Sequence, residues 1–411
     1  MAARKKIADD TPVADLTRGD KISLLRRSIK DKFKGRAMLT TGSEFEAPYT
    51  CVRLPTRIIS LDLALGGGFP AGGVSEIIGA ESSAKTTLLN RIFHVQQELH
   101  GSDTALAIAM TEHRYDKMHA RQNCGVKVAL SKKEIASMES TMRRKFTDEE
   151  IKDLRAQVGE LDEINADTIE KLYESVLEVI GSNLFQVVGI DSWGNFLTND
   201  MADGNMEDRT YGGAAGVNTL FCNKAAPLFT MPDENGDMNY TALIGINHYR
   251  AKIAGANAKA SMMTNMNIQG GHALKHLKLV SLYLASKPTW ATVGGKNRKV
   301  GRTVSWEIIK GKAGCSDGGK GEFNIIYGHG IDVEEANIMT GVEWGVIKQS
   351  GSWLKVYDPS DGAELMRAQG STNLAEQLRL DPALHLHLCD QVLRFAADKD
   401  GINIVTNYKR P

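Results

Sequence analysis

Residues 79–86 read Gly-Ala-Glu-Ser-Ser-Ala-Lys-Thr and combine the residue types that a phosphate-binding loop uses. An apolar run at 74–78 precedes them and Leu88-Leu89 follows, which predicts a strand, a tight loop and a helix. In that context backbone N–H groups surround phosphate oxygens, and the helix N-terminus adds partial positive charge. We predict that Lys85 reaches the β- and γ-phosphates of a nucleotide and that Thr86 binds Mg²⁺ through its hydroxyl.

The loop departs from the usual pattern at one position, because Ala84 stands where a glycine is expected before the lysine. If that position needs a positive φ, the methyl group crowds the loop. The alternative interpretation is a chance strand–turn–helix with a surface lysine, and both flanks and the Lys85-Thr86-Thr87 ending count against it. The expected nucleotide contacts are Gly79, Glu81, Ser82, Ser83, Ala84, Lys85, Thr86 and Thr87.

Two further apolar runs end in acidic residues. Residues 105–110 predict a buried parallel strand that leads to Glu112, and residues 185–190 predict another that ends at Asp191 and Ser192. Sites in open α/β sheets collect at the carboxyl ends of strands. An acid there commonly supports the Mg²⁺ that the loop hydroxyl binds, so we predict that Thr86 and Asp191 hold the metal.

Composition restricts the class of protein. The chain has 411 residues, of which 42% are apolar and 24% charged, an ordinary globular balance without an apolar run long enough to span a bilayer. Its five cysteines are far apart and form no C-x-x-C pair, which argues against zinc or a disulfide framework and favours a reducing compartment. We therefore expect a cytoplasmic protein with no membrane partner.

Charge is segregated along the chain although the net charge is zero. Residues 238–306 contain ten Lys and Arg residues and no Asp or Glu, whereas residues 131–180 contain thirteen acidic and eight basic residues. Segregation of this kind indicates either a charged partner such as nucleic acid or a basic solvated face. Composition by itself does not separate the two.

The remaining elements follow from periodicity. Asp20 is expected to cap a helix with the apolar stripe Ile22, Leu25, Ile29 and Phe33, which packs on its own core or on a neighbouring subunit. Residues 46–78 read as an extended lead-in, 131–163 as an inserted helical hairpin, and the segment from 169 to 181 as an amphipathic helix. Residues 199–216 show no period, and 249–271 read as a long functional loop. Strands expected at 241–247, 277–284, 300–309 and 322–327 complete an α/β core with an antiparallel extension, followed by a small α/β module.

In order along residues 30–360, these motifs resemble RecA-type recombinases. The resemblance rests on 32–35, 60–66, 79–87, Thr111-Glu112-His113 with Asp116, 247–253, 270–275, Lys310-Gly311-Lys312 and 322–330. It implies a RecA-like P-loop ATPase core with a mostly parallel central sheet, a small N-terminal helical segment and a small α/β C-terminal domain. The expected divisions are 1–45 for the tail and oligomerisation helix, 46–331 for the core and 332–411 for the C-terminal domain.

The resemblance also implies residue roles. Glu112 would orient the attacking water, Asp191 and Ser192 would support the metal or γ-phosphate, and Asp116 and His119 would contact adenine. Asn247 and His248 would sense the γ-phosphate, and Lys310 and Lys312 would reach the neighbouring subunit's γ-phosphate. Each residue also has an ordinary structural interpretation. Glu112 could be a surface carboxylate, and His248 could be a histidine at a strand end that bonds to the backbone. Lys310 and Lys312 could belong to a solvated strand edge.

DNA contacts are expected from two loops. Arg209 lies in the first, residues 199–212, and the second carries Arg250, Lys252, Met262 and Met263 and ends at Gly270-Gly271. Arginine and lysine contacts to phosphate would provide affinity without sequence preference, and the methionines either insert between bases or only pack the loop.

The implied function is an ATP- and Mg²⁺-dependent recombinase that forms homo-oligomeric filaments on single-stranded DNA and pairs it with double-stranded DNA. One alternative is a filament scaffold that binds nucleotide with little hydrolysis, which Ala84 and His248 favour. Another is a replicative helicase or loader. Lys310 and Lys312 count against it, because a ring helicase would be expected to have an arginine at that position. Ala84, His248, the insertion and a C-terminus without an acidic tail indicate a divergent member, and a phage origin is one interpretation.

Overall fold

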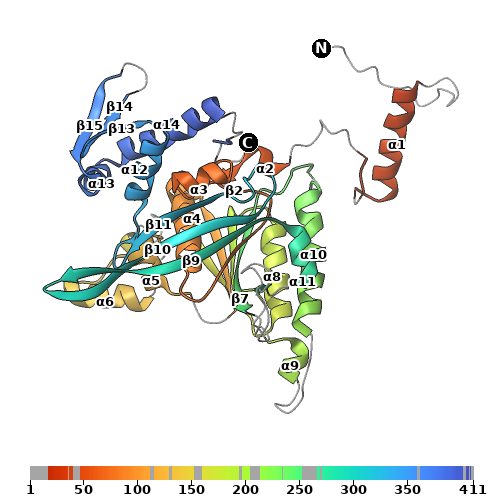
Figure 1. The fold of residues 1–411 in the computed structure, drawn as a ribbon. Helices are drawn as coiled ribbons and strands as arrows, with labels where there is room; N and C mark the ends of the chain where they lie inside the picture. Colours follow the sequence, from red (N-terminus) through yellow and green to blue (C-terminus); the bar gives the residue numbers. More distant parts are fainter. Residues whose placement is uncertain are drawn as a thin grey trace, which may run out of the picture.

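The computed structural model describes residues 17–35, 37–39, 47–111, 115–128, 132–151, 160–193, 197–203, 213–233, 235–251, 266–268, 271–358, 362–400, 404–406 and 408. Within these ranges the chain forms a ten-stranded sheet between two layers of helices, a three-stranded C-terminal sheet and a helix near the N-terminus (Figure 1). The predicted α/β class with a mostly parallel central sheet is confirmed. Among the described helices, none is long and apolar enough to cross a membrane.

Six strands form the parallel part of the large sheet. In spatial order they are β9 (Lys278–Val293), β3 (Gly73–Gly79), β7 (Ala242–Ala251), β6 (Val187–Asp191), β4 (Ala105–Met110) and β5 (Glu160–Ile164). Gly79 at the end of β3 is in register with His248 on β7, and Asp191 ends the adjacent strand β6. The parallel order therefore brings the phosphate loop, the second predicted acid and the end of β7 to one edge of the sheet.

Helices cover both faces of these strands, which explains their continuous apolar runs. One face carries α4 (Lys85–His100) and α5 (Lys117–Cys124), and the other carries α8 (Ile169–Gly181), α10 (Gly213–Thr230) and α11 (Gly271–Leu277). Along β4, Leu106 and Ile108 pack on the first layer, whereas Ala107 and Ala109 pack on the second. The predicted stripe of α8 is fully buried on the second face.

The sheet continues as an antiparallel extension through β10 (Lys296–Gly311), β11 (Lys320–Ile326) and β12 (Gly330–Ile331). Strands β9 and β10 form a long hairpin that runs past the edge of the parallel strands, as Figure 1 shows. Most of its outer part, from Lys287 to Lys299, is exposed to solvent.

The C-terminal region forms a core of its own. Its elements are α12 (Val333–Glu343), β13 (Ile347–Ser350), β14 (Trp353–Tyr357), β15 (Glu364–Gln369), α13 (Ser371–Leu380) and α14 (Pro382–Asp400). Ile59 and Leu63 on α3 (Ile59–Ala64) complete this core, and the Asn337 side-chain oxygen accepts a hydrogen bond from Ile59 N at 2.9 Å. A segment from the N-terminal half thus attaches the C-terminal region to the large sheet.

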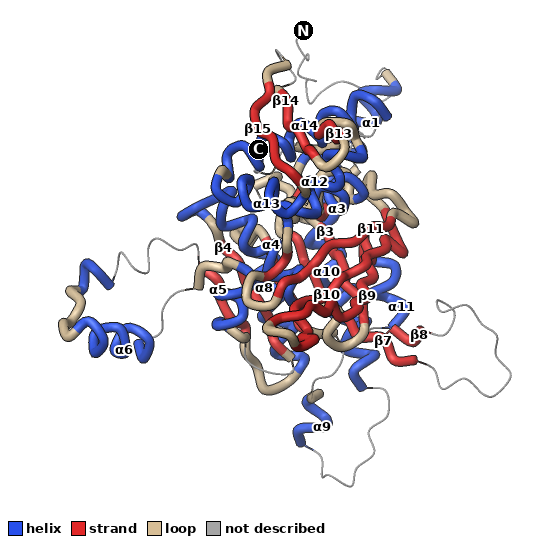
Figure 2. The backbone as a smooth tube through the Cα atoms, turned by 60° about the vertical axis from the view of Figure 1, so that its left-hand side comes forward, coloured by secondary structure: helices blue, strands red, loops and turns tan. Residues whose placement is uncertain are grey.

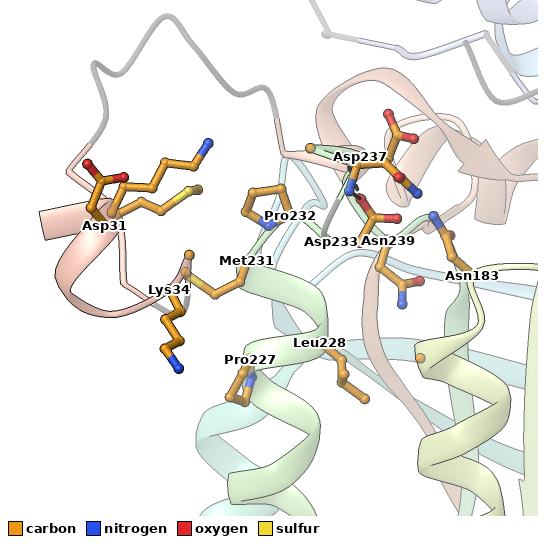
Figure 3. A pocket seen from close by; sticks show the side chains of 16 residues that line it. Asp31, Lys34, Asn183, Pro227, Leu228, Met231, Pro232, Asp233, Asp237 and Asn239 are labelled. Carbon is orange, nitrogen blue, oxygen red and sulfur yellow. Dashed lines mark hydrogen bonds between the residues drawn. The ribbon is translucent and has the colours of Figure 1, made fainter. Parts of the chain in front are cut away.

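The N-terminal helix α1 (Arg18–Lys32) stands apart from the sheet in Figure 1 and buries none of its residues. Thr17, rather than the expected Asp20, is its N-cap, and Asp20 is the third helical residue of a capping box. Most of the apolar stripe is exposed, with Leu25 52% and Phe33 47% accessible, and Ile29 is half-buried. The turn that closes the helix lines a cavity of about 940 Å³ opposite the end of α10 and the following loop, where Figure 3 shows Lys34 facing Met231 and Pro227.

The expectation of an extended lead-in at 46–78 is wrong in part. The segment contains α2 (Pro48–Cys51), β1 (Arg53–Leu54), α3 and β2 (Phe69–Pro70) before β3. Helix α3 presents Leu61 to the core of the large sheet and Ile59 and Leu63 to the C-terminal core. A helix buried on two sides lacks a polar face, so its sequence does not show helical amphipathicity.

The expectation of a helical hairpin through residue 163 is also wrong at its end. Helix α6 (Lys132–Met142) is present, and the segment 160–164 is the edge strand β5, parallel to β4. Leu161 and Ile164 pack on opposite faces of the sheet. Pairing with β4 therefore decides the conformation of a short charged segment.

Both expected DNA loops contain more regular structure than predicted. Residues 199–203 form α9 (Asn199–Asp203), α10 begins at Gly213, β7 continues to Ala251, and β8 (Met266–Ile268) pairs antiparallel with its end. Figure 2 shows α9 at the bottom of the molecule and β8 beside β7 on its right-hand side. The borders of the second loop are thus joined by backbone pairing, which a segment rich in Ala, Asn and Ser does not indicate.

Candidate nucleotide-binding site

The loop between β3 and α4 has the conformation of a phosphate-binding loop. Helix α4 begins at Lys85, whose ammonium group is buried and donates to the carbonyl oxygens of Gly79 at 3.1 Å and Ala80 at 2.6 Å. A Cβ on Gly79 would lie 2.2 Å from Ser83 Oγ and 2.5 Å from the carbonyl oxygen of Leu284, so the close approach at this position requires glycine. The lysine therefore lies across the loop rather than in solvent.

Ala84 adopts a positive φ, the conformation that favours glycine at this position of the loop. Its φ is +75°, in the left-handed region, and Ser82 has φ of +55°. Side chains with a Cβ rarely adopt these angles. The alanine thus occupies a position that favours glycine, and the loop keeps its shape in spite of it.

The two residues predicted to hold Mg²⁺ contact each other. Thr86 Oγ1 donates a hydrogen bond to Asp191 Oδ2 at 2.8 Å, although 105 positions separate them in the sequence. A hydroxyl and a carboxylate are the hard oxygen ligands that Mg²⁺ uses beside substrate phosphates. The donor set therefore fits a magnesium ion bound together with a nucleotide.

A cavity of about 300 Å³ lies over this pair. It is lined by Glu81, Ser82, Ser83, Ala84, Lys85, Thr86, Thr87, Met110, Asp191 and His248. Nine of these ten residues are among the predicted site residues, and Met110, the last residue of β4, was not predicted. The sheet thus collects the loop, the acid and His248 from three strand ends into one cavity.

Thr111 belongs to a motif that carries the resemblance, but no role was predicted for it. Its hydroxyl donates to the carbonyl oxygen of Ser192 and accepts from Ser192 N, both at 2.9 Å, and its own N–H donates to the carbonyl oxygen of Asp191. These bonds tie the end of β4 to the end of β6 and leave Ser192 buried. The feature of the sequence that could have indicated Thr111 is its hydroxyl group at the end of an apolar strand. Glu112 follows it in the chain and lies outside the described residues.

Asn247 lies inside the sheet, unlike its neighbour His248. The Asn247 side-chain nitrogen donates to Glu76 Oε1 at 2.7 Å, and the other Glu76 oxygen accepts from Lys278 and from Ser281 at 3.3 Å. Glu76, Lys278 and Asn247 are all buried. His248 lines the cavity, so the structure separates the two residues that the sequence pairs as phosphate sensors.

Asp116 and His119 lie at the start of α5. Asp116 caps this helix and accepts a hydrogen bond from His119 N at 2.9 Å, and the His119 ring contacts Asn123 on the next turn at 2.9 Å. Buried Tyr115 donates to Asn90 on α4 at 2.6 Å and attaches α5 to the helix that follows the loop. The predicted adenine contacts are therefore joined to the phosphate loop through α4.

Lys310 and Lys312 lie toward the opposite end of the parallel strands from the phosphate loop. Lys310 is in register with Ser281, and its ammonium group donates to the carbonyl oxygens of Lys278, at 2.7 Å, and Lys275. Lys278 is in register with Val74, so about 16 Å of β3 separates this end from Gly79. Neither lysine can reach the phosphate loop of its own chain.

Most of the predicted DNA-contacting residues lie outside the part of the chain that the structure describes. Arg209, Lys252, Met262, Met263 and Gly270 lie outside the described residues. The backbone of Arg250 pairs with Asn267 between β7 and β8, and Gly271 begins α11. The structure therefore places the borders of the second loop and leaves its contacts as predictions.

A mostly parallel sheet with this loop, a buried lysine and a hydroxyl–carboxylate pair at its carboxyl edge is the arrangement of a P-loop α/β protein. A family model described as the RecA N-terminal domain matches residues 21–138. The Protein RecA of Chloroflexus aurantiacus (strain ATCC 29364 / DSM 637 / Y-400-fl) is 28% identical over 355 residues, which cover 86% of this chain and 85% of the relative.

Two further relatives, also named Protein RecA, match over most of their length. The protein of Chlorobium chlorochromatii (strain CaD3) is 27% identical over 388 residues, or 94% of each chain. The protein of Thermus thermophilus is 28% identical over 384 residues, which cover 91% of this chain and 96% of the relative. Over most of its length the chain is therefore similar to proteins named RecA, and residues 21–138 match the RecA N-terminal domain.

Proposed function

We propose that this chain is an ATP-dependent DNA recombinase. It would form helical filaments on single-stranded DNA, pair that strand with homologous double-stranded DNA and hydrolyse ATP. The observation that carries the proposal is the hydrogen bond between Thr86 and Asp191. It lies beside buried Lys85, at the carboxyl ends of the parallel strands of a RecA-like sheet. Similarity to proteins named RecA over most of the chain supports it. Cytoplasmic location remains our expectation.

Binding of ATP would use the cavity over the loop. Lys85 and the N-terminus of α4 would balance phosphate charge, and Thr86 and Asp191 would hold Mg²⁺. When bound, the metal would neutralise charge on the β- and γ-phosphates. Asp116 and His119 on α5 would contact the base.

Hydrolysis would require two groups from different subunits. Glu112 would orient the attacking water, and its neighbour Thr111 is tied to Asp191 and Ser192 by hydrogen bonds. Lys310 and Lys312 would stabilise charge on a neighbour's γ-phosphate, because they lie across the sheet from their own loop. Activity would therefore depend on the filament.

DNA would bind at the end of the molecule that holds the cavity. Helix α9 begins the first predicted loop, and β7, β8 and Gly271 border the second (Figure 2). The His248 that lines the cavity is one residue from Tyr249, which pairs with Ile268 of β8. Nucleotide and DNA would thus act on the same strand.

The test is ATP hydrolysis by the purified protein with and without single-stranded DNA, beside Glu112→Gln and the control Glu178→Gln, an exposed glutamate on α8. We expect DNA to stimulate hydrolysis, Glu112→Gln to reduce it at least about 100-fold and Glu178→Gln to leave it unchanged. Hydrolysis that does not respond to DNA would contradict the proposal.

The left-handed conformation of Ala84 favours one alternative, a DNA-filament scaffold that binds nucleotide and scarcely hydrolyses it. The strained loop, together with His248 in the cavity, could hold ATP without efficient positioning for attack. Filaments that form on single-stranded DNA with ATP while neither the wild type nor Glu112→Gln turns over would favour the scaffold.

A further inference from the structure

The phosphate loop is held from outside by the long hairpin. The Ser82 carbonyl oxygen accepts a hydrogen bond from Arg302 Nη1 on β10 at 2.6 Å and another from Ser286 Oγ on β9 at 3.0 Å. The same guanidinium nitrogen lies 2.7 Å from Ser286 Oγ. Ser286 is in register with Val304, two residues beyond Arg302, so both donors come from the part of the hairpin that passes the loop.

The guanidinium is anchored on its other side. Arg302 Nε donates to the Tyr327 hydroxyl at 3.3 Å, on the residue after β11. Arginine presents several donors in a fixed plane, and a lysine could not make the contacts to Ser82, Ser286 and Tyr327 together. Arg302 therefore bridges the loop, β9 and the end of β11.

These contacts fix one peptide plane of the loop. The Ser82 carbonyl points to the hairpin, and the N–H of the same peptide, on Ser83, points back to the Ala80 carbonyl oxygen at 3.3 Å. Ser82 and Ala84 both have positive φ although neither is glycine. Residues with a Cβ disfavour that conformation, so a loop of this sequence needs external contacts to keep it.

We propose that Arg302 is a positioning residue of the phosphate loop. With Ser286 it holds the Ser82 peptide so that the loop retains its phosphate-binding shape, and it offsets the strain that Ala84 introduces. The inference rests on the proposed binding of ATP at this loop. It assigns to the antiparallel hairpin a direct effect on nucleotide affinity.

The test is a double-mutant cycle of Arg302→Met and Ala84→Gly, in the full-length protein, with ATP·Mg²⁺ affinity measured by calorimetric titration. We expect Arg302→Met to weaken ATP binding about tenfold and to change the turnover rate at saturating ATP less than twofold. Ala84→Gly removes strain, so in that background the same replacement should cost less than about threefold. The control Arg298→Met, an exposed arginine of the same strand, should leave affinity unchanged.

Two measurements separate this effect from misfolding. The thermal midpoint of each variant without nucleotide reports folding, and Ser286→Ala removes the second donor with a small change and should weaken ATP binding about threefold. Equal loss from Arg302→Met in both backgrounds, or affinities of Arg302→Met and Ser286→Ala equal to wild type, would overturn the inference. Absence of ATP binding by the wild type would instead reject the proposed function.

Discussion

Lys310 shows how its surroundings change the acid–base properties of a single residue. Its half-buried ammonium group donates to backbone carbonyl oxygens, and loss of water around it lowers its pKa to about 8. The positive charges of Lys312 and Lys278 lower the pKa further, and the carboxylate of Glu76 opposes them. As pH rises through about 8, the group therefore changes from ammonium to neutral amine.

We predict that Lys310 in the free subunit reacts with acetic anhydride with a midpoint near pH 8, because only the neutral amine is nucleophilic. A neighbour's triphosphate would favour the ammonium form, so assembly with ATP and DNA should suppress the reaction at pH 8. Mass spectrometry of the acetylated peptide measures both. A midpoint near the ordinary lysine value, or equal reactivity before and after assembly, would contradict the assignment.

At the scale of elements, strands β3, β7 and β9 are joined by a buried charged cluster. Glu76 on β3 binds Lys278 and Ser281 on β9 and Asn247 on β7, within the sheet that carries the phosphate loop. Burial removes the two charges from water, so each depends on the other. The cluster therefore fixes the alignment of three strands whose ends form the site.

We predict that Glu76→Gln lowers the free energy of unfolding by about 3–5 kcal/mol, because it leaves the Lys278 ammonium buried without its counter-charge. Adding Lys278→Met removes that charge and should recover most of the loss. Urea denaturation measures these values, and Glu307→Gln, which breaks the more exposed pair with Lys320, should cost less than about 1 kcal/mol. Equal losses for Glu76→Gln and Glu307→Gln would be inconsistent with a buried pair.

At the scale of the whole molecule, the sheet separates the parts of one proposed active site. The phosphate loop and Asp191 lie at the carboxyl ends of the parallel strands, and Lys310 lies toward their amino ends. A complete site would then combine the loop of one subunit with the lysines of the next, which requires repeated association of identical chains.

We predict that two inactive variants complement each other. Glu112→Gln subunits retain the lysines, and subunits with Lys310→Ala and Lys312→Ala retain Glu112. In an equimolar mixture about a quarter of the interfaces combine both intact parts, so ATP hydrolysis should return to about a quarter of the wild-type rate. No recovery in mixed filaments, verified by co-assembly of labelled subunits, would contradict the assignment of the lysines to a neighbour's site.

Local patterns predicted those parts of the fold that depend on neighbours in the sequence. The loop between β3 and α4, strand β4 at 105–110 and helix α8 at 169–181 are confirmed, because apolar periodicity and loop residues act within a short window. Helix α3 and strand β5 were mispredicted, since α3 is buried on two sides and β5 is decided by pairing with β4. The site residues around Lys85 were predictable for the same local reason.

The sequence by itself determined the class of fold, the loop and the types of group available for phosphate chemistry. The tertiary structure alone decided that Thr86 contacts Asp191, that Asn247 turns to Glu76 and that Lys310 lies across the sheet. It also brought Arg302 to the Ser82 carbonyl across 220 positions of sequence. These contacts follow from strand order and register, which are set by burial over the whole sheet and therefore do not appear in any local stretch of sequence.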